Sequence, residues 1–197
     1  MSSVLAIRDT ALANGLRELL AQLERRLALT QPLQVYLAGG LAVHLYCGNR
    51  VTSDVDAEFS ARVFLPADLL VNVRLEDGSE KVLHFDTNYN STFALMHEDY
   101  VKDSVETDLR LEHVHLRVLS PVDLAVSKIS RFADVDRSDI AQLVRSGLVT
   151  PEQIEGRAQE AMVGYVGGLE MLKLNLRDAL ACASEAYAAV QADHGGN

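Results

Sequence analysis

Two adjacent glycines that directly follow a short apolar stretch constrain this fold more than any other feature of the sequence. Residues 34–38 (QVYLA) have the length and apolar character of a buried strand, and Gly39-Gly40 ends it. Residues 41–46 then predict a short helix. A strand, a glycine pair and a helix in this order leave free backbone N–H groups at a helix N-terminus. A phosphate can bind there because no side chain blocks its approach.

An Asp-x-Asp pair follows the glycines. Asp54 and Asp56 lie in residues 54–59, whose alternation of polar and apolar residues predicts a strand. Residues two apart on a strand project from one face, so their Cα atoms would be roughly 6.5 Å apart. Such a carboxylate pair is tolerated at an exposed edge or where a divalent cation neutralises it. Alone, the glycines are typical of a turn and the acids of a solvated edge strand. Together they predict Mg²⁺-assisted chemistry on a nucleoside triphosphate.

The other elements predict an α+β fold that ends in helices. Leucines at helical spacing indicate a helix over residues 2–29, and a hairpin is expected within residues 70–85 around an Asp-Gly turn. After a strand at residues 114–119, two cap-and-proline signals and Ala- and Leu-rich segments indicate helices over the remainder of the chain. We therefore expect a small mixed β-sheet core with its N-terminal helix in residues 1–119. An all-helical C-terminal region would follow in residues 120–197, and the whole would form one compact unit.

Two blocks of the sequence resemble a known superfamily. The glycine pair, a helix and then R-x-T-x-D-x-D at residues 50–56 are similar to the nucleotidyltransferase superfamily, which has the polymerase-beta-like fold. A second block, LAVSKISR at residues 124–131 followed by DRSDI at residues 136–140, resembles a bacterial branch of that superfamily that includes AbiEii-type toxins of toxin–antitoxin systems. The resemblance covers about residues 35–143 and implies a nucleotidyltransferase core flanked by helices.

The resemblance implies a role for five residues. Gly39 and Gly40 would bind triphosphate oxygens through their backbone N–H groups. Asp54 and Asp56 would ligate Mg²⁺ and would be catalytic. Lys128 would contact the nucleotide phosphates as a point charge, and a solvated helix lysine is the alternative. Because the chain has only four lysines and this one lies on an apolar helix face, a functional role is favoured.

Further candidates each have two interpretations. Arg50 is expected to contact a phosphate or to fix the loop before the acid pair, and Ser53 to reach a phosphate or to cap the strand entry. Asp139 is expected to brace the lysine of the second block or to be solvated. Active members of the superfamily have a third carboxylate, as metal ligand or as general base toward the acceptor hydroxyl. Asp86, at the end of the strand VLHFD, is our candidate for this catalytic acid, and Glu58 is the alternative.

Composition limits the expected partners and location. Lys plus Arg is 18 and Asp plus Glu is 28, so the net charge is −10, which disfavours broad electrostatic binding to nucleic acid or to an anionic membrane. No stretch approaches the ~18 consecutive apolar residues of a membrane-spanning helix, and the N-terminus lacks a signal-peptide pattern. Cys47 and Cys182 are too few for a disulfide framework. We therefore expect a cytoplasmic protein with no membrane partner.

These observations predict a Mg²⁺-dependent nucleotidyltransferase that moves a nucleoside monophosphate from an NTP to an acceptor hydroxyl. The acceptor would be RNA such as a tRNA end, a protein or a small molecule. The second block suggests a toxin–antitoxin or defence component, with a cognate antitoxin or a second copy of the chain as partner. The alternative is a non-catalytic nucleotide-binding module on the same fold, which would bind NTP without turnover.

Overall fold

The computed structural model describes residues 4–195, and these residues divide into two compact units. Unit 1 contains residues 4–89 and 104–119, and every strand of the described chain belongs to it. Unit 2 contains residues 90–103 and the chain from Ser120 onward, and it is helical. The predicted α+β class is confirmed, because mixed sheets are flanked by helices and a run of helices follows them.

Unit 1 contains two small β-sheets. The first has four strands in the order β3 (Ala57–Phe59), β1 (Leu33–Leu37), β7 (Val114–Val118) and β6 (Val105–Glu106). β1 runs parallel to β7 and antiparallel to β3, so this sheet is mixed. The second sheet has three strands in the order β2 (Asp54–Val55), β5 (Glu80–Phe85) and β4 (Leu70–Arg74). β4 and β5 form the predicted hairpin, which turns at Gly78, where φ is +84°.

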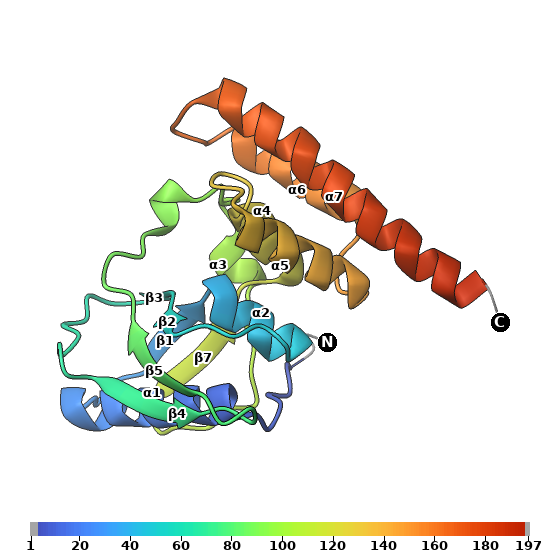
Figure 1. Cartoon of the computed structure of the whole chain (residues 1–197). Helices are drawn as coiled ribbons and strands as arrows, with labels where there is room; N and C mark the ends of the chain where they lie inside the picture. Colours follow the sequence, from blue (N-terminus) through green and yellow to red (C-terminus); the bar gives the residue numbers. More distant parts are fainter. Residues whose placement is uncertain (1–3, 196–197) are drawn as a thin grey trace. The chain divides into compact units, whose positions relative to one another are not determined.

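The first helix, α1 (Ala11–Leu27), covers the hairpin sheet. The helix packs against β4 and β5 (Figure 1), and its leucines are buried as their spacing predicts. The helix begins at residue 11 and not near residue 2, because the Thr10 hydroxyl oxygen accepts the Ala13 N–H and caps it. Before the cap, Leu5 forms a β-bridge with Thr107. Residues 2 and 3 of the predicted helix lie outside the described residues.

The second helix, α2 (Gly39–Cys47), follows β1 directly. It begins at Gly39, so both glycines belong to the first turn of the helix predicted for residues 41–46. Seven of its nine residues are buried. At its far end the Tyr46 hydroxyl donates to the Leu119 carbonyl oxygen at 2.9 Å, which ties α2 to the end of β7, and burial raises the pKa of Tyr46.

The strand predicted over residues 54–59 is in fact two strands in different sheets. β2 ends at Val55 and pairs with β5, whereas β3 begins at Ala57 and pairs with β1. Asp56 lies at the switch, and its carbonyl oxygen accepts the Ala38 N–H at 2.8 Å. Alternation alone could not reveal the switch, because both halves keep the same polar and apolar period. The assumption that one strand carries both aspartates was therefore wrong.

Unit 2 is built from four main helices, α4 (Pro121–Ser127), α5 (Asp134–Arg145), α6 (Pro151–Met162) and α7 (Leu169–Gly195), with the short η1 (Ser91–Phe93) and α3 (Tyr100–Asp103). Ser120 and Thr150 cap α4 and α6 as predicted. α4 ends at Ser127, and Phe132, five residues further on, has a left-handed φ of +47°. α7 packs against α5 and α6 (Figure 1). No helix in the described part of the chain is long and apolar enough to cross a bilayer.

A half-buried arginine joins three segments of unit 2. Arg157 of α6 donates from Nε to Asp123 Oδ1 of α4 at 2.7 Å and from Nη2 to Asp123 Oδ2 at 3.0 Å. The same Nη2 reaches Asp103 of α3 at 2.7 Å. Burial disfavours the guanidinium, but the hydrogen bonds and charges of both aspartates outweigh it and raise the pKa of Arg157. This pairing is the physical reason why residues 90–103 belong to unit 2.

Candidate active site

The start of α2 is shaped by a contact that only glycine permits. Gly39 has φ +62°, a left-handed conformation that other residues rarely adopt. A Cβ added there would lie 1.7 Å from Asp56 Oδ2. The Asp56 carboxylate therefore lies directly against the first residue of α2, where free N–H groups point outward. The sequence placed the glycines and the acid pair in one site, and for Gly39 and Asp56 the geometry agrees.

Gly40 is buried behind this position and faces the loop that leads to the acids. A Cβ added at Gly40 would lie 3.3 Å from Nη2 of Arg50 and 3.4 Å from Cβ of Thr52. The Arg50 guanidinium thus packs against the second glycine, and its Nη1 donates to the carbonyl oxygen of Val51. This places one cation beside the N-terminus of α2, which is the position that a phosphate-binding arginine requires.

The short ladder between β2 and β5 sets the strand register of Asp54 and of the third acid candidate, Asp86. Asp54 lies opposite His84 and Val55 opposite Phe85. One step further, the Asp86 N–H donates to the Val55 carbonyl oxygen at 3.1 Å, so Asp86 is next in register to Asp56. Val55 and Phe85 are buried. Because strand residues alternate between faces, Asp54 and His84 belong to the opposite face. Asp56 and Asp86 directly follow the ends of β2 and β5.

His84 is a member of this cluster that sequence reasoning missed. Its Nε2 lies 3.3 Å from Asp54 Oδ1, and the two side chains are 48% and 60% exposed. The available signal was position, since His84 precedes Asp86 by two residues on a predicted strand and shares its face. A search for metal-type spacing such as H-E-x-x-H could not find it.

The remaining candidates of unit 1 are Glu58, Asp86 and Ser53. Glu58 is on β3 opposite Tyr36, in the sheet that does not contain β2. Asp86 continues the strand adjacent to β2, and one of its carboxylate oxygens accepts the Asn88 N–H at 2.8 Å. Ser53 precedes β2, and its carbonyl oxygen accepts the His84 N–H at 3.2 Å. Topology therefore favours Asp86 over Glu58 as the third carboxylate.

The donor set fits a metal that arrives together with a nucleotide. No three His, Cys, Asp or Glu side chains within residues 4–195 are arranged to hold a metal ion by themselves. Mg²⁺ is commonly held by one or two carboxylates together with substrate phosphates and water, and not by a cage of protein ligands. Asp56, against the N-terminus of α2, and Asp54, two residues earlier, are the carboxylates that would supply such a site.

Lys128 lies in unit 2, where two buried carboxylates contact it. Its Nζ is 2.7 Å from Asp139 Oδ2 and 3.7 Å from Asp136 Oδ1, and the side chain is 7% exposed. Arg131 forms a bidentate pair with Asp136, whose Oδ2 also accepts the Ala133 N–H. Burial opposes ionisation of Asp136, but these hydrogen bonds and the two cations hold its pKa below the ordinary value. The bracing of Lys128 by Asp139 is confirmed, and its phosphate contact stays a prediction.

The fold, the glycine-bounded helix and the adjacent acids define the class of nucleotidyltransferases. Residues 14–177 match the family described as nucleotidyltransferases of unknown function (DUF6036), and the chain belongs to that family. The matched range covers unit 1 from α1 onward and unit 2 up to α7. No curated protein matches the chain.

Proposed function

We propose that this protein transfers a nucleoside monophosphate from an NTP to an acceptor hydroxyl, with pyrophosphate as the leaving group. The observation that carries the proposal is the contact of Asp56 with Gly39, because it joins a carboxylate to a helix N-terminus. A triphosphate and a metal need these two features side by side. Membership of a nucleotidyltransferase family supports the same activity.

Each residue of the site has a defined task in this proposal. The N–H groups of Gly39 and Gly40 and the Arg50 guanidinium bind the β- and γ-phosphate oxygens, and Ser53 flanks them. Asp54 and Asp56 hold Mg²⁺, which neutralises charge on the phosphate oxygens. Asp86 takes the proton from the acceptor hydroxyl as the hydroxyl oxygen bonds to the α-phosphorus. The bond from the α-phosphorus to the bridging oxygen breaks, and pyrophosphate carries the electron pair away.

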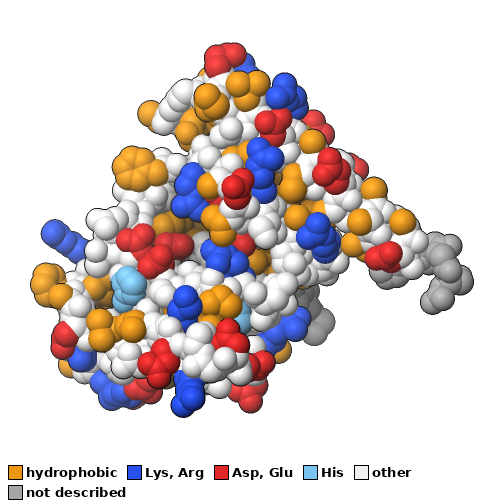
Figure 2. Space-filling model, in the orientation of Figure 1, with side chains coloured by type: hydrophobic (Ala, Val, Ile, Leu, Met, Phe, Trp, Pro, Cys, Tyr) orange, Lys and Arg blue, Asp and Glu red, His pale blue; other side chains and the backbone are white. Residues whose placement is uncertain are grey.

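In this proposal the acceptor is a protein or a small molecule in preference to a tRNA end. The net charge is −10, and on the face drawn in Figure 2 the basic side chains are scattered among acidic ones and form no continuous patch. RNA acceptors need several phosphate contacts from such a patch.

The block around Lys128 motivates a further proposal, a toxin–antitoxin or defence role near AbiEii-type toxins with an antitoxin or a second copy as partner. A small partner gene upstream is the observation that tests it.

A second candidate function is a nucleotide-binding module without turnover. It is favoured by the finding that no three metal-type ligands within the described residues are grouped. This candidate predicts that NTP binds with Mg²⁺ while no product forms.

One experiment separates the two functions. Each of four α-³²P-labelled NTPs is incubated with the protein, Mg²⁺ and a bacterial lysate, and the label is counted in RNA, protein and small-molecule fractions. Transfer predicts label in one fraction, absent with the Asp54→Asn/Asp56→Asn variant and retained with Glu170→Gln, whose side chain is 92% exposed in unit 2. Label at the level of the double variant, with NTP binding retained, would leave only the binding module.

A further inference from the structure

We infer that His44 is a positioning residue that fixes Arg50 beside the phosphate site by holding the backbone of its loop. The inference rests on the proposed function, because it assigns the loop a role in nucleotide binding. His44 lies in α2, is 5% exposed and contacts Thr10 and Arg50.

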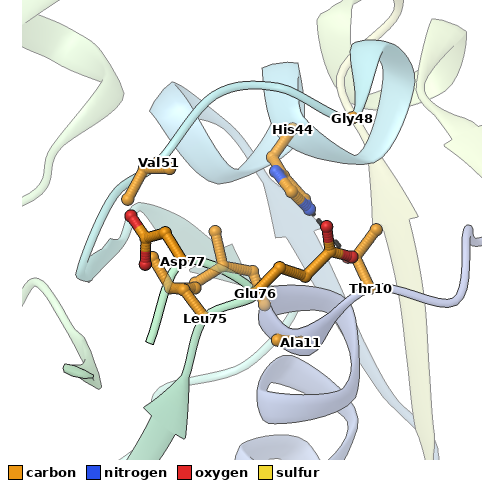
Figure 3. A pocket seen from close by; sticks show the side chains of 9 residues that line it. Thr10, Ala11, His44, Gly48, Val51, Leu75, Glu76 and Asp77 are labelled. Carbon is orange, nitrogen blue, oxygen red and sulfur yellow. Dashed lines mark hydrogen bonds between the residues drawn. The ribbon is translucent and has the colours of Figure 1, made fainter. Parts of the chain in front are cut away.

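Both ring nitrogens of His44 are engaged. Nδ1 lies 2.7 Å from the Arg50 carbonyl oxygen, and Nε2 lies 2.8 Å from the Thr10 hydroxyl oxygen. Figure 3 shows His44 pointing from α2 toward Thr10 at the start of α1. The imidazole therefore joins three segments, namely the cap of α1, the middle of α2 and the loop between α2 and β2.

The partners fix the tautomer of the ring. A carbonyl oxygen only accepts, so Nδ1 carries the hydrogen and donates to Arg50. Nε2 is then an acceptor, and the Thr10 hydroxyl donates to it while accepting the Ala13 N–H. Burial lowers the pKa of His44, and the nearby Arg8 charge lowers it further, so the neutral form is favoured. A neutral ring with one donor and one acceptor satisfies both contacts without a buried charge.

The carbonyl oxygen that His44 contacts belongs to Arg50, whose side chain lies beside the first turn of α2. Arg50 packs its guanidinium against Gly40, and residues 48–53 form neither helix nor strand. Gly48, in the left-handed region at φ +86°, ends α2 and turns the chain into this loop. A long side chain on an irregular segment is pre-organised only if its backbone is held, and binding is tighter when less freedom is lost.

The side chain of His44 borders a hollow. Thr10, His44, Val51, Glu76 and Asp77 are among the residues that line a hollow of about 240 Å³ (Figure 3). His44 thus lies on the wall of a hollow and not in the middle of the leucine core of α1. Replacement by a smaller side chain is accordingly expected to leave unit 1 folded.

A double-mutant cycle on nucleotide affinity tests the inference. His44→Asn keeps an amide N–H near the position of Nδ1, whereas His44→Leu removes both hydrogen bonds at similar bulk. We expect His44→Leu to weaken binding of a non-hydrolysable NTP with Mg²⁺ by about tenfold, as the loss of one well-formed hydrogen bond would, and His44→Asn to stay within about threefold. In an Arg50→Met background His44→Leu should have no further effect.

The contrary outcomes are distinct. An equal loss from His44→Leu in both backgrounds, or none in the wild-type background, overturns the positioning role. Hydrogen–deuterium exchange of residues 49–53 is measured in the same proteins without nucleotide, and it should rise in His44→Leu but not in His44→Asn. If the wild-type protein binds no NTP, the proposed function fails. The exchange rates then still decide whether His44 fixes the loop.

Discussion

Both units of this protein depend on aspartates, but they hold them in opposite ways. In unit 2, Asp123, Asp136 and Asp139 are no more than 2% exposed, and each contacts a cation. In unit 1, the Asp54 side chain is 60% exposed and faces a histidine, and Asp86 accepts a backbone N–H.

The difference shows what each set of carboxylates can do. A buried carboxylate remains charged only if cations and hydrogen bonds replace its water, so the unit 2 acids are committed to holding helices together. An acid on a solvated ladder keeps its charge in water and can exchange that water for a metal. The buried acids that contact cations are thus the structural ones here, and the exposed ladder is the candidate for chemistry.

The largest expected effect sharpens the comparison within unit 1. Asp86→Asn should lower transfer by roughly 10²- to 10⁴-fold, because a general base is removed from the strand beside Asp56. Glu58→Gln, in the other sheet, should change the rate by less than about threefold. Single-turnover rates at saturating NTP measure both. Equal losses from the two variants would mean that the register does not identify the third carboxylate.

The next effect concerns stability and belongs to unit 2. Asp123→Ala leaves the Arg157 guanidinium, 14% exposed, without its bidentate partner, and should cost about 3–5 kcal/mol in the free energy of unfolding. Denaturant titration measures it, with Glu170→Ala as a control that should leave the midpoint unchanged. In contrast, Asp54→Asn should leave the midpoint near that of the wild type. A stability loss from Asp54→Asn as large as that from Asp123→Ala would break the comparison.

Two glycines with similar backbone angles separate strain from contact. Gly39 and Gly147 have φ of +62° and +68°, so alanine at either should cost about 1–2 kcal/mol from the left-handed backbone. Only at Gly39 would the new Cβ displace the Asp56 carboxylate, since nothing lies within 4 Å of a Cβ at Gly147. Gly39→Ala should therefore be the less stable variant and should also lose NTP affinity. Equal melting temperatures would contradict the Gly39–Asp56 contact.

The smallest expected effect is on the pH dependence of stability, because His44 and Asp136 contribute over different pH ranges. The pKa of His44 is below its ordinary 6.5, so the unfolded chain takes up this proton first and stability falls as the pH drops below 6.5. The other ionisable groups near the ring are Arg8 and two acids that line the same hollow, Glu76 and Asp77. The pKa of Asp136 is also lowered, so its contribution is present above 3.8 and is lost as the pH falls below that value. The melting temperatures of wild type and His44→Asn should approach each other as the pH falls from 6.5 to 5. A difference in melting temperature that does not change with pH would exclude His44 as the cause of the pH dependence.

The sequence anticipated local signals and missed long-range ones. The Ser120 and Thr150 caps, the Gly78 turn and the glycine start of α2 were all predicted, because each depends on a few neighbouring residues. The sheet switch at Asp56 and the Asp54–His84 contact depend on pairing with residues about 20 to 30 positions away. The Lys128 block was recognised as a unit, but only the structure shows that Asp136 is shared with Arg131.

The most direct test of the central claim is the effect of Mg²⁺ on nucleotide affinity. A non-hydrolysable NTP is titrated calorimetrically into wild type, Asp54→Asn and the Glu170→Gln control, with and without Mg²⁺. Our prediction is that Mg²⁺ tightens NTP binding by about tenfold or more in wild type and control, and has no such effect in Asp54→Asn. The same affinity with and without Mg²⁺ in the wild type, or an unchanged Mg²⁺ effect in Asp54→Asn, would contradict it.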